Sequence, residues 1–273
     1  MQTLSDATYR KIAALMHDAI GLSFGDGKKA LVLSRLSQRV QRLGLGSFEA
    51  YLGLITSEQD GGEFQMAVDL LTTNETYFFR EPRHFELLEQ ELIEQQPASL
   101  QVWSAASSFG DEAYSIAMLL SDLQQQGRIG SDWSILGTDI SDRVLRSAVQ
   151  AVYPRERLRF VSPQRLKRHC LRGEAESEGL VQMRDSLTQR VSFGQLNLCL
   201  PIEALGPFDV VFLRNVLIYF DADTKRAVVD RVLSQLRVGG LFFIGTAEGR
   251  APCDTPLQAL APGVFRKLAG GER

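Results

Sequence analysis

Polar side chains stand at the ends of several apolar, strand-like runs in this sequence. A turn of small residues that closes with an acidic pair, AASSFGDE (105–112), follows the first run. Asp139 ends the second run, Asn197 lies near the end of the third, and Arg214 with Asn215 follows the fourth. Ligands of open α/β sheets bind beyond the carboxyl ends of the strands. We therefore expect these side chains to gather around one crevice.

The turn at residues 105–112 is poorly suited to a phosphate group. A dinucleotide site would need three glycines in a G-x-G-x-x-G pattern, with the pyrophosphate at the N-terminus of the following helix. Here Gly110 stands alone, and Asp111 and Glu112 would repel a pyrophosphate. S-adenosylmethionine has no phosphate and carries a cationic sulfonium and an ammonium group, so it fits this turn better. Glu112 could stabilise the positive ligand, and Asp139 could accept hydrogen bonds from the two ribose hydroxyls.

Two residues of the turn also have simpler interpretations. Asp111 can favour the start of the helix that follows it through the helix dipole, a contribution of about 0.3–1 kcal/mol. Phe109 can either form a wall of the cofactor pocket or pack behind it.

The sequence offers no catalytic nucleophile and no metal cluster. The three histidines and three cysteines are scattered without metal-ligand spacing, and neither a G-x-S-x-G turn nor a P-loop occurs. Methyl transfer from S-adenosylmethionine needs no enzyme nucleophile. A carboxylate acceptor, with a reference pKa of about 4, is already ionised at neutral pH and needs no general base. Such an enzyme mainly has to align the attacking oxygen with the methyl group.

The elements that would position these side chains form two groups. Helical periodicity predicts a small helical domain at residues 1–72, before a linker at 73–83. From residue 100 onward strands alternate with helices, which is typical of a doubly wound α/β sheet. The run FDVVFL favours a central parallel strand that is buried on both faces. The expected strands are 100–106, 133–139, 190–198, 208–215, 241–248 and 263–268, and the expected helices among them are 111–126, one that starts near 141, and 222–237, with Gly239 and Gly240 between the last helix and its strand.

The composition is that of an ordinary globular protein. Of 273 residues 44% are hydrophobic and 23% charged, and the net charge is −3, so nothing points to a nucleic-acid or membrane partner. No signal-like segment opens the chain, and no apolar run approaches the roughly 20 residues of a membrane-spanning helix. The separated cysteines suit a reducing compartment. We expect a monomeric cytoplasmic protein that binds no nucleic acid and is not inserted in the membrane.

Long sequence strings then point to one family. The chain contains, in this order, TNETYFFRE (73–81), VWSAASSFGDEAYSIAM (102–118), GTDIS (137–141), LNL (196–198), FDVVFLRNVLIYFD (208–221) and GGLFFIGTAE (239–248). These strings resemble the chemotaxis-receptor glutamate methyltransferases, the CheR family, over nearly the whole chain. The resemblance implies a Rossmann-like S-adenosylmethionine-dependent methyltransferase domain at residues 84–273 behind the all-α domain. It also implies an inserted β-subdomain at about 165–192, inside a charge-rich segment (153–190) that could otherwise be a solvated surface.

The resemblance assigns roles to the residues that match the family motifs. The implied cofactor contacts are Asn74, Thr76, Arg80, Glu112, Asp139, Asn197, Leu198, Arg214 and Asn215. Arg80 and Tyr219 are implied to be catalytic, because they would orient the acceptor carboxylate and the donor. The chain departs from the family at Ala113, where a proline is usual, and at Phe109, which replaces a smaller polar residue. Neither departure touches Glu112.

Three of these residues have purely structural alternatives. Arg80 could form a surface ion pair with Glu81 or Glu86. Tyr219 could pack at the start of a helix, and Asn74 could be a helix N-cap.

The resemblance implies transfer of a methyl group to glutamate side chains of chemoreceptor cytoplasmic helices, with S-adenosylhomocysteine as product, during chemotactic adaptation. A receptor C-terminal tail could bind the β-subdomain. The basic helix face of Lys28, Lys29, Arg35, Arg39 and Arg42 could contact acidic receptor helices or could be solvated. Two alternatives stay open: a methyltransferase of RNA or a small molecule, and a non-catalytic protein that binds S-adenosylhomocysteine.

Overall fold

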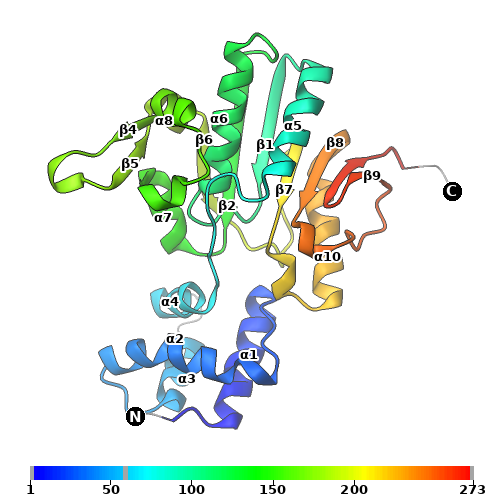
Figure 1. Cartoon of the computed structure of the whole chain (residues 1–273). Helices are drawn as coiled ribbons and strands as arrows, with labels where there is room; N and C mark the ends of the chain where they lie inside the picture. Colours follow the sequence, from blue (N-terminus) through cyan, green and yellow to red (C-terminus); the bar gives the residue numbers. More distant parts are fainter. Residues whose placement is uncertain (1–2, 58–60, 271–273) are drawn as a thin grey trace.

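Residues 3–57 and 61–270 are described by the computed structural model, and the predicted domain limits at residues 1 and 273 lie outside them. Figure 1 shows a group of helices from the N-terminal part, in blue, and a larger part in which helices cover a sheet. The chain passes between them through residues 72–81. Within the described ranges, no helix combines the length and apolarity needed to cross a membrane.

Four α-helices form the N-terminal part within the described residues. Ser5 caps the first of them, because its hydroxyl accepts a hydrogen bond from the backbone nitrogen of Thr8 at 3.1 Å. Gly21 ends the same helix in the left-handed conformation, with a φ of 72°. Apolar residues at helical spacing, such as Ile12 and Met16, are fully buried in a core that the helices share. The helices are α1 Asp6–Ile20, α2 Lys29–Arg42, α3 Phe48–Ser57 and α4 Gly62–Leu71.

A seven-stranded sheet with the order β6-β2-β1-β7-β8-β10-β9 forms the centre of the larger part. The strands from β6 to β8 are parallel, and β10 and β9 are antiparallel. The chain goes from β1 to β2 on one side and later to β7 on the other, so the topological switch point lies between β1 and β7. The elements are β1 Ser99–Ser104, β2 Asp132–Asp139, β6 Val191–Gln195, β7 Phe208–Leu213, β8 Leu236–Ile244, β9 Leu257–Ala261 and β10 Val264–Lys267, with α5 Pro82–Gln95, α6 Asp111–Gln125, α7 Asp142–Gln150 and α10 Ala222–Ser234.

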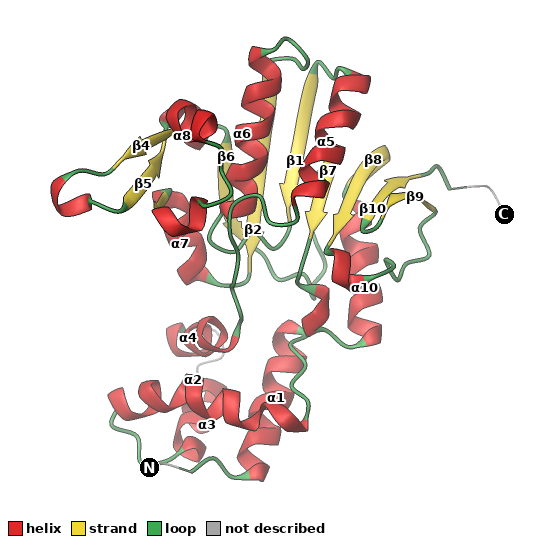
Figure 2. Ribbon diagram, in the orientation of Figure 1, coloured by secondary structure: helices red, strands yellow, loops and turns green. Residues whose placement is uncertain are grey.

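Helices cover both faces of this sheet, as Figure 2 shows for α5 and α6 in front and α10 behind. The side chains of β7 alternate accordingly, because successive residues of a strand point to opposite faces. Val210 and Phe212 join the core that contains α5 and α6, whereas Val211 and Leu213 join the core that contains α10. The predicted doubly wound α/β fold behind an all-α domain is confirmed.

Some predicted elements differ from the observed ones. The sequence pattern does not predict helix α5 or strand β9. The third predicted strand, 190–198, ends at Gln195. Gly239 and Gly240 lie inside β8 and not before it, because the strand already begins at Leu236. Gly239 has a φ of 81°, and the pairing of β7 with β8 shifts register near this point, so the glycines form a bulge.

A small antiparallel sheet with the order β3-β5-β4 stands beside the main sheet (Figure 1). It begins at Val152, well before the expected start of the β-subdomain near residue 165. Asp122 of α6 holds this segment: its carboxylate accepts a hydrogen bond from Arg165 Nε at 2.7 Å and lies 2.9 Å from His169 Nε2. Arg165 and His169 of this basic segment therefore attach it to the main domain. Its elements are β3 Val152–Pro154, α8 Pro163–His169, β4 Cys170–Arg172, β5 Leu180–Met183 and α9 Asp185–Thr188.

Candidate functional site

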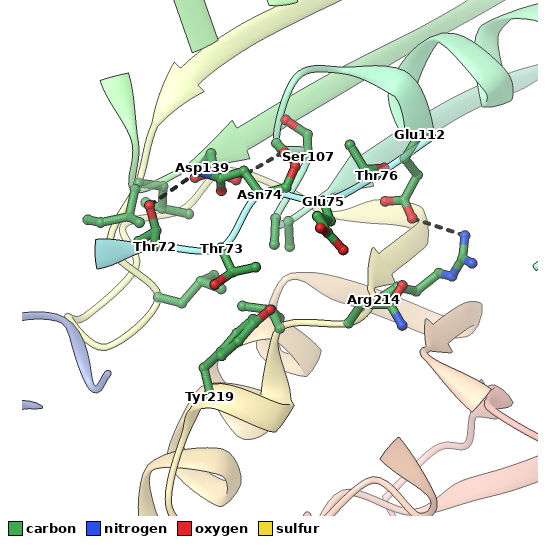
Figure 3. Close-up of a pocket in the computed structure, with 18 of the residues that line it drawn as sticks. Thr72, Thr73, Asn74, Glu75, Thr76, Ser107, Glu112, Asp139, Arg214 and Tyr219 are labelled. Atoms are coloured by element: carbon green, nitrogen blue, oxygen red, sulfur yellow. Dashed lines mark hydrogen bonds and ion pairs between the residues drawn. The ribbon is translucent and has the colours of Figure 1, made fainter. Parts of the chain in front are cut away.

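A pocket lies where the ends of β1, β2 and β7 meet the linker and the end of α1 (Figure 3). Apolar side chains such as Leu22 and Phe220 line it together with polar ones such as Asp139 and Arg214. This mixture is typical of a site for a small organic ligand.

Every residue that the sequence assigns to the site lines this pocket. The structure brings them together from the linker, from the first turn of α6, from the end of β2 and from the segments that follow β6 and β7. What each of them binds stays a prediction. The residues are Asn74, Thr76, Arg80, Glu112, Asp139, Asn197, Leu198, Arg214, Asn215 and Tyr219.

Asp139 presents a carboxylate that backbone amides hold in place. Its Oδ2 accepts a hydrogen bond from Ser108 N at 2.9 Å, and its Oδ1 accepts one from Ser141 N at 3.0 Å. Burial raises the pKa of Asp139, and these two hydrogen bonds oppose the rise. A carboxylate oxygen has two lone pairs, so each oxygen can accept a further hydrogen bond. A pair of neighbouring hydroxyls, as in a ribose, matches that capacity.

Glu112 faces Arg214 across the topological switch point (Figure 3). Its Oε2 lies 3.1 Å from Arg214 Nη1, and its Oε1 accepts a hydrogen bond from Ser104 Oγ at 2.6 Å. Burial raises the pKa of Glu112, and the Arg214 guanidinium counteracts the rise. Arg214 is buried too, and its Nη2 lies 3.5 Å from a carboxylate oxygen of Glu81. With Glu75 and Asp139, which line the same pocket, these carboxylates outnumber the Arg80 and Arg214 guanidiniums, and the net negative charge suits a cationic ligand.

The turn after β1 offers small groups to the pocket. Residues 105–108 line it, and the buried Ser107 hydroxyl has no hydrogen-bond partner among the described residues. Gly110 has a φ of 86°, and a Cβ added there would lie 3.0 Å from the Ala148 side chain, so the turn requires glycine. An orphaned hydroxyl beside small residues fits a polar ligand that approaches the backbone closely. The donor set and this turn therefore fit S-adenosylmethionine.

The structure settles the interpretation of Phe109 and adds a second role for Asp111. Phe109 is absent from the pocket lining, and the Arg157 guanidinium lies 4.6 Å from its ring centroid, so it packs behind the turn. Asp111 is fully buried and binds Arg157 through two hydrogen bonds, of 2.9 and 2.6 Å. Burial raises the pKa of Asp111 to about 6, and Arg157 opposes the rise. Asp111 thus attaches the segment after β3 to the turn, in addition to its place in the first turn of α6.

The end of α1 also forms part of the pocket, which the sequence does not reveal. Ile20 and Leu22 line it, and the Asn197 amide donates a hydrogen bond to the carbonyl oxygen of Ala19 at 2.8 Å. Asn197, one of the implied cofactor contacts, therefore ties the helical domain to the sheet. Ile20 and Leu22 resemble any other apolar core residues, so no sequence signal marks them. Other lining residues without a predicted role include Thr73, Tyr77, Phe85, Ile140, Leu196, Val216 and Phe220.

Arg80 and Tyr219 reach the pocket from different segments. Arg80 Nη1 donates a hydrogen bond to the carbonyl oxygen of Glu75 at 2.9 Å, within the linker. Glu81, its alternative partner, instead accepts a hydrogen bond from Thr246 N at 3.0 Å. The Tyr219 ring projects into the pocket (Figure 3). Both side chains are therefore placed where an acceptor and a donor could meet.

Two arginines of the basic face of α2 bind other residues of this chain. Arg35 Nη1 donates hydrogen bonds to the carbonyl oxygens of Leu71, at 2.6 Å, and Thr72, at 3.1 Å, and its Nη2 donates to Thr73 Oγ1 at 2.7 Å. Arg39 forms a bidentate pair with a buried glutamate of α4. Both arginines thus have partners in this chain in place of the receptor contact suggested by the sequence, and Arg35 fixes the start of the linker.

The models of two protein-family domains match this chain, and together they cover most of it. "CheR methyltransferase, all-alpha domain" matches residues 7–72. "CheR methyltransferase, SAM binding domain" matches residues 74–255, which contain every residue assigned to the site.

Known bacterial proteins are similar over nearly the same length. A chemotaxis protein methyltransferase of Escherichia coli is 41% identical over 246 residues, which cover 90% of this chain and 85% of the relative. The protein of the same name in Klebsiella aerogenes is 41% identical over 246 residues, 90% of this chain and 84% of the relative. Chemotaxis protein methyltransferase 2 of Pseudomonas aeruginosa is 39% identical over 248 residues, 88% and 85% of the two chains.

Proposed function

The chain belongs to the CheR methyltransferase family, and from this we propose which acceptor it methylates and which of its residues hold the donor. It is an S-adenosylmethionine-dependent methyltransferase of chemotaxis. The proposed acceptors are glutamate side chains on the cytoplasmic helices of a chemoreceptor. The products are then a glutamyl methyl ester and S-adenosylhomocysteine. Methylation of RNA or of a small molecule, and binding without turnover, are not favoured by these relatives.

In this proposal the donor lies across the topological switch point with its charged groups matched to the pocket. Asp139 takes the ribose hydroxyls, because both of its oxygens keep a free lone pair beside their backbone hydrogen bonds. Glu112 stabilises the ammonium group of the methionine part, supported by the excess of carboxylates over guanidiniums around the pocket. The remaining proposed contacts are Asn74, Thr76, Arg80, Asn197, Leu198 and Asn215.

The observation that carries the choice of acceptor is the chemistry of the pocket lining. Among its described residues there is no histidine, lysine or cysteine, and the carboxylates of Glu112 and Asp139 already accept hydrogen bonds within the chain. A glutamate with a reference pKa of about 4.3 is ionised at neutral pH, so it can attack without a general base. One of its oxygens forms a bond to the methyl carbon while the carbon–sulfur bond of the sulfonium breaks, and the electron pair stays on sulfur. No proton moves in this step.

Arg80 and Tyr219 supply the alignment that this reaction needs. The Arg80 guanidinium can pair with the acceptor carboxylate, and the Tyr219 hydroxyl can donate a hydrogen bond to it. Both groups orient the attacking oxygen toward the methyl group without exchanging protons with it.

We further propose that the protein works as a cytoplasmic monomer on its receptor. The small sheet is the proposed holder of a receptor C-terminal tail. In support, β4 lies at an edge of the sheet order β3-β5-β4, and an edge strand can accept an added strand through backbone hydrogen bonds.

The chemical nature of the product tests the proposed function. The protein is incubated with methyl-labelled S-adenosylmethionine and receptor cytoplasmic fragments, and the labelled fragments are then treated with base. We expect the label to be released as volatile methanol, because carboxyl methyl esters hydrolyse in base. Label that stays on nitrogen, or label on RNA added as a competing acceptor, would contradict the proposal.

A further inference from the structure

An exposed cation contacts two neighbouring aromatic rings next to the pocket. Tyr77 of the linker and Phe160, which follows β3, have ring centroids 5.3 Å apart. The Arg159 guanidinium lies 4.9 Å from the centroid of Tyr77 and 4.8 Å from that of Phe160. Phe160 is 58% exposed, so a partner can reach this side of the patch. We call these three residues the aromatic–arginine patch.

The patch has a fixed position relative to the pocket. The backbone nitrogen of Phe78 donates a hydrogen bond to the carbonyl oxygen of Arg157 at 3.3 Å, and Arg157 Nη2 donates to the carbonyl oxygen of Thr76 at 3.4 Å. The ion pair between Arg157 and the buried Asp111 attaches the same segment to the first turn of α6. Tyr77 itself lines the pocket, so the Arg159 guanidinium contacts the ring of a pocket-lining residue.

The charge of Arg159 is available to a partner. No carboxylate of the described residues forms an ion pair with it, whereas the neighbouring Arg157 forms one with Asp111. Contact with the two rings restrains the guanidinium, and its N–H groups have no hydrogen-bond partner among the described residues, so they can bind a carboxylate. An exposed cation that has no carboxylate partner and contacts a pocket-lining residue is a suitable subsite for an anion.

We propose that the aromatic–arginine patch binds a second carboxylate of the substrate, on the same helix face as the glutamate that enters the pocket. This inference rests on the proposed function. On a helix, residues three or four apart face the same way, with Cβ atoms about 5–6 Å apart. A receptor helix with one acidic side chain in the pocket therefore presents the next one, a turn away, beside Tyr77. The patch thus selects glutamates that have an acidic neighbour at helical spacing.

The test uses matched pairs of enzymes and substrates. The enzymes are wild type, Arg159→Gln and Arg128→Gln, since Arg128 is an exposed arginine in the loop between α6 and β2 and its change removes the same charge. The substrates are receptor fragments with one acceptor glutamate, and with glutamate or glutamine one turn before and after it. We expect the glutamine neighbours to lower kcat/KM of wild type and Arg128→Gln by about two- to fivefold, which is typical of an exposed ion pair.

Arg159→Gln should show the same reduced kcat/KM with both kinds of fragment, so the effects of the two changes are not additive. Phe160→Ala should change kcat/KM in the same direction, because it removes one face of the patch. The affinity for S-adenosylhomocysteine should be equal in all variants.

Two results would overturn the inference. One is an Arg159→Gln enzyme that still distinguishes the two kinds of fragment as wild type does. The other is inhibition by single-stranded RNA that Arg159→Gln relieves, with no effect of the glutamine neighbours, because the patch would then bind nucleic acid. Failure of the proposed function looks different: no fragment would acquire a base-labile methyl ester with any of the enzymes.

Discussion

The hydrogen bonds of Arg35 predict that this side chain stabilises the start of the linker. Arg35→Gln replaces a guanidinium that donates three hydrogen bonds, to Leu71 O, Thr72 O and Thr73 Oγ1, by an amide that can keep one of them. Arg42→Gln, near the end of the same helix, removes the same charge from an exposed position. The two variants therefore separate a structural role of Arg35 from a role of the basic face as a whole.

The expected loss of stability follows from the two hydrogen bonds that are not replaced. Hydrogen bonds from charged donors contribute about 1.5–3 kcal/mol each, and water can satisfy part of this half-buried site. We expect Arg35→Gln to lower the free energy of unfolding by about 2–4 kcal/mol, and Arg42→Gln to change it by less than about 0.5 kcal/mol. Since Thr72 and Thr73 line the pocket, Arg35→Gln should also weaken the binding of S-adenosylhomocysteine.

Urea unfolding followed by circular dichroism measures the first effect, and titration calorimetry with S-adenosylhomocysteine measures the second. The structural account of Arg35 would be refuted by a variant as stable as wild type that binds S-adenosylhomocysteine normally. If both variants instead lost kcat/KM toward receptor fragments, with a strong dependence on salt, α2 would be a docking surface.

Three further changes test other parts of the site. Tyr219→Phe should keep the affinity for S-adenosylhomocysteine and lower kcat about 10- to 100-fold, as expected for one lost hydrogen bond to a charged group; a lost affinity would give Tyr219 a different role. Gly21→Ala and Gly44→Ala both place alanine at positive φ, but a Cβ at Gly21 would lie 2.5 Å from a cysteine sulfur of the other domain and a Cβ at Gly44 meets nothing within 4 Å. Gly21→Ala should therefore be less stable than Gly44→Ala by about 1–3 kcal/mol in urea unfolding, and equal stabilities would contradict the packing of α1 against the sheet domain. Although burial opposes ionisation of Glu81, the Arg214 guanidinium and the hydrogen bonds around the carboxylate hold the pKa of Glu81 at about 2, below its usual value of 4.5. A lowered pKa stabilises the fold above pH 4.5 and loses that contribution as the pH falls toward 2, so Glu81→Gln should reduce the acid sensitivity of unfolding by about 2–3 kcal/mol, and an unchanged pH profile would refute the assignment.

The strand ends could be predicted because their residue types change abruptly. In FDVVFLRN and WSILGTD an apolar run stops at a charged or amide side chain, and the alternation of strands and helices places those stops at one edge of the sheet. Asp139, Arg214 and Asn215 accordingly meet at one pocket. The glycine turn could be interpreted in part: Glu112 faces the pocket as expected, whereas Asp111 pairs with Arg157 and does not line it.

The partners of charged residues could not be predicted, because they depend on how distant segments pack. Asp111 pairs with Arg157, 46 residues away, and Arg35 binds the end of α4. The periodicity of α2 shows which side of the helix is basic but not what faces it. The contribution of α1 to the pocket was hidden for the same reason, since Ile20 and Leu22 are apolar residues like many others.

Donor binding to a variant of Asp139 tests the central claim most directly. Asp139→Ala removes the carboxylate proposed to hold the ribose, and Asp132→Ala removes an exposed carboxylate at the other end of the same strand, β2. Titration calorimetry with S-adenosylhomocysteine should show at least about a 100-fold loss of affinity for Asp139→Ala, as expected for two lost hydrogen bonds to a charged group, and none for Asp132→Ala. Wild-type affinity in Asp139→Ala, with an intact fold, would contradict the placement of the donor at the ends of β1, β2 and β7.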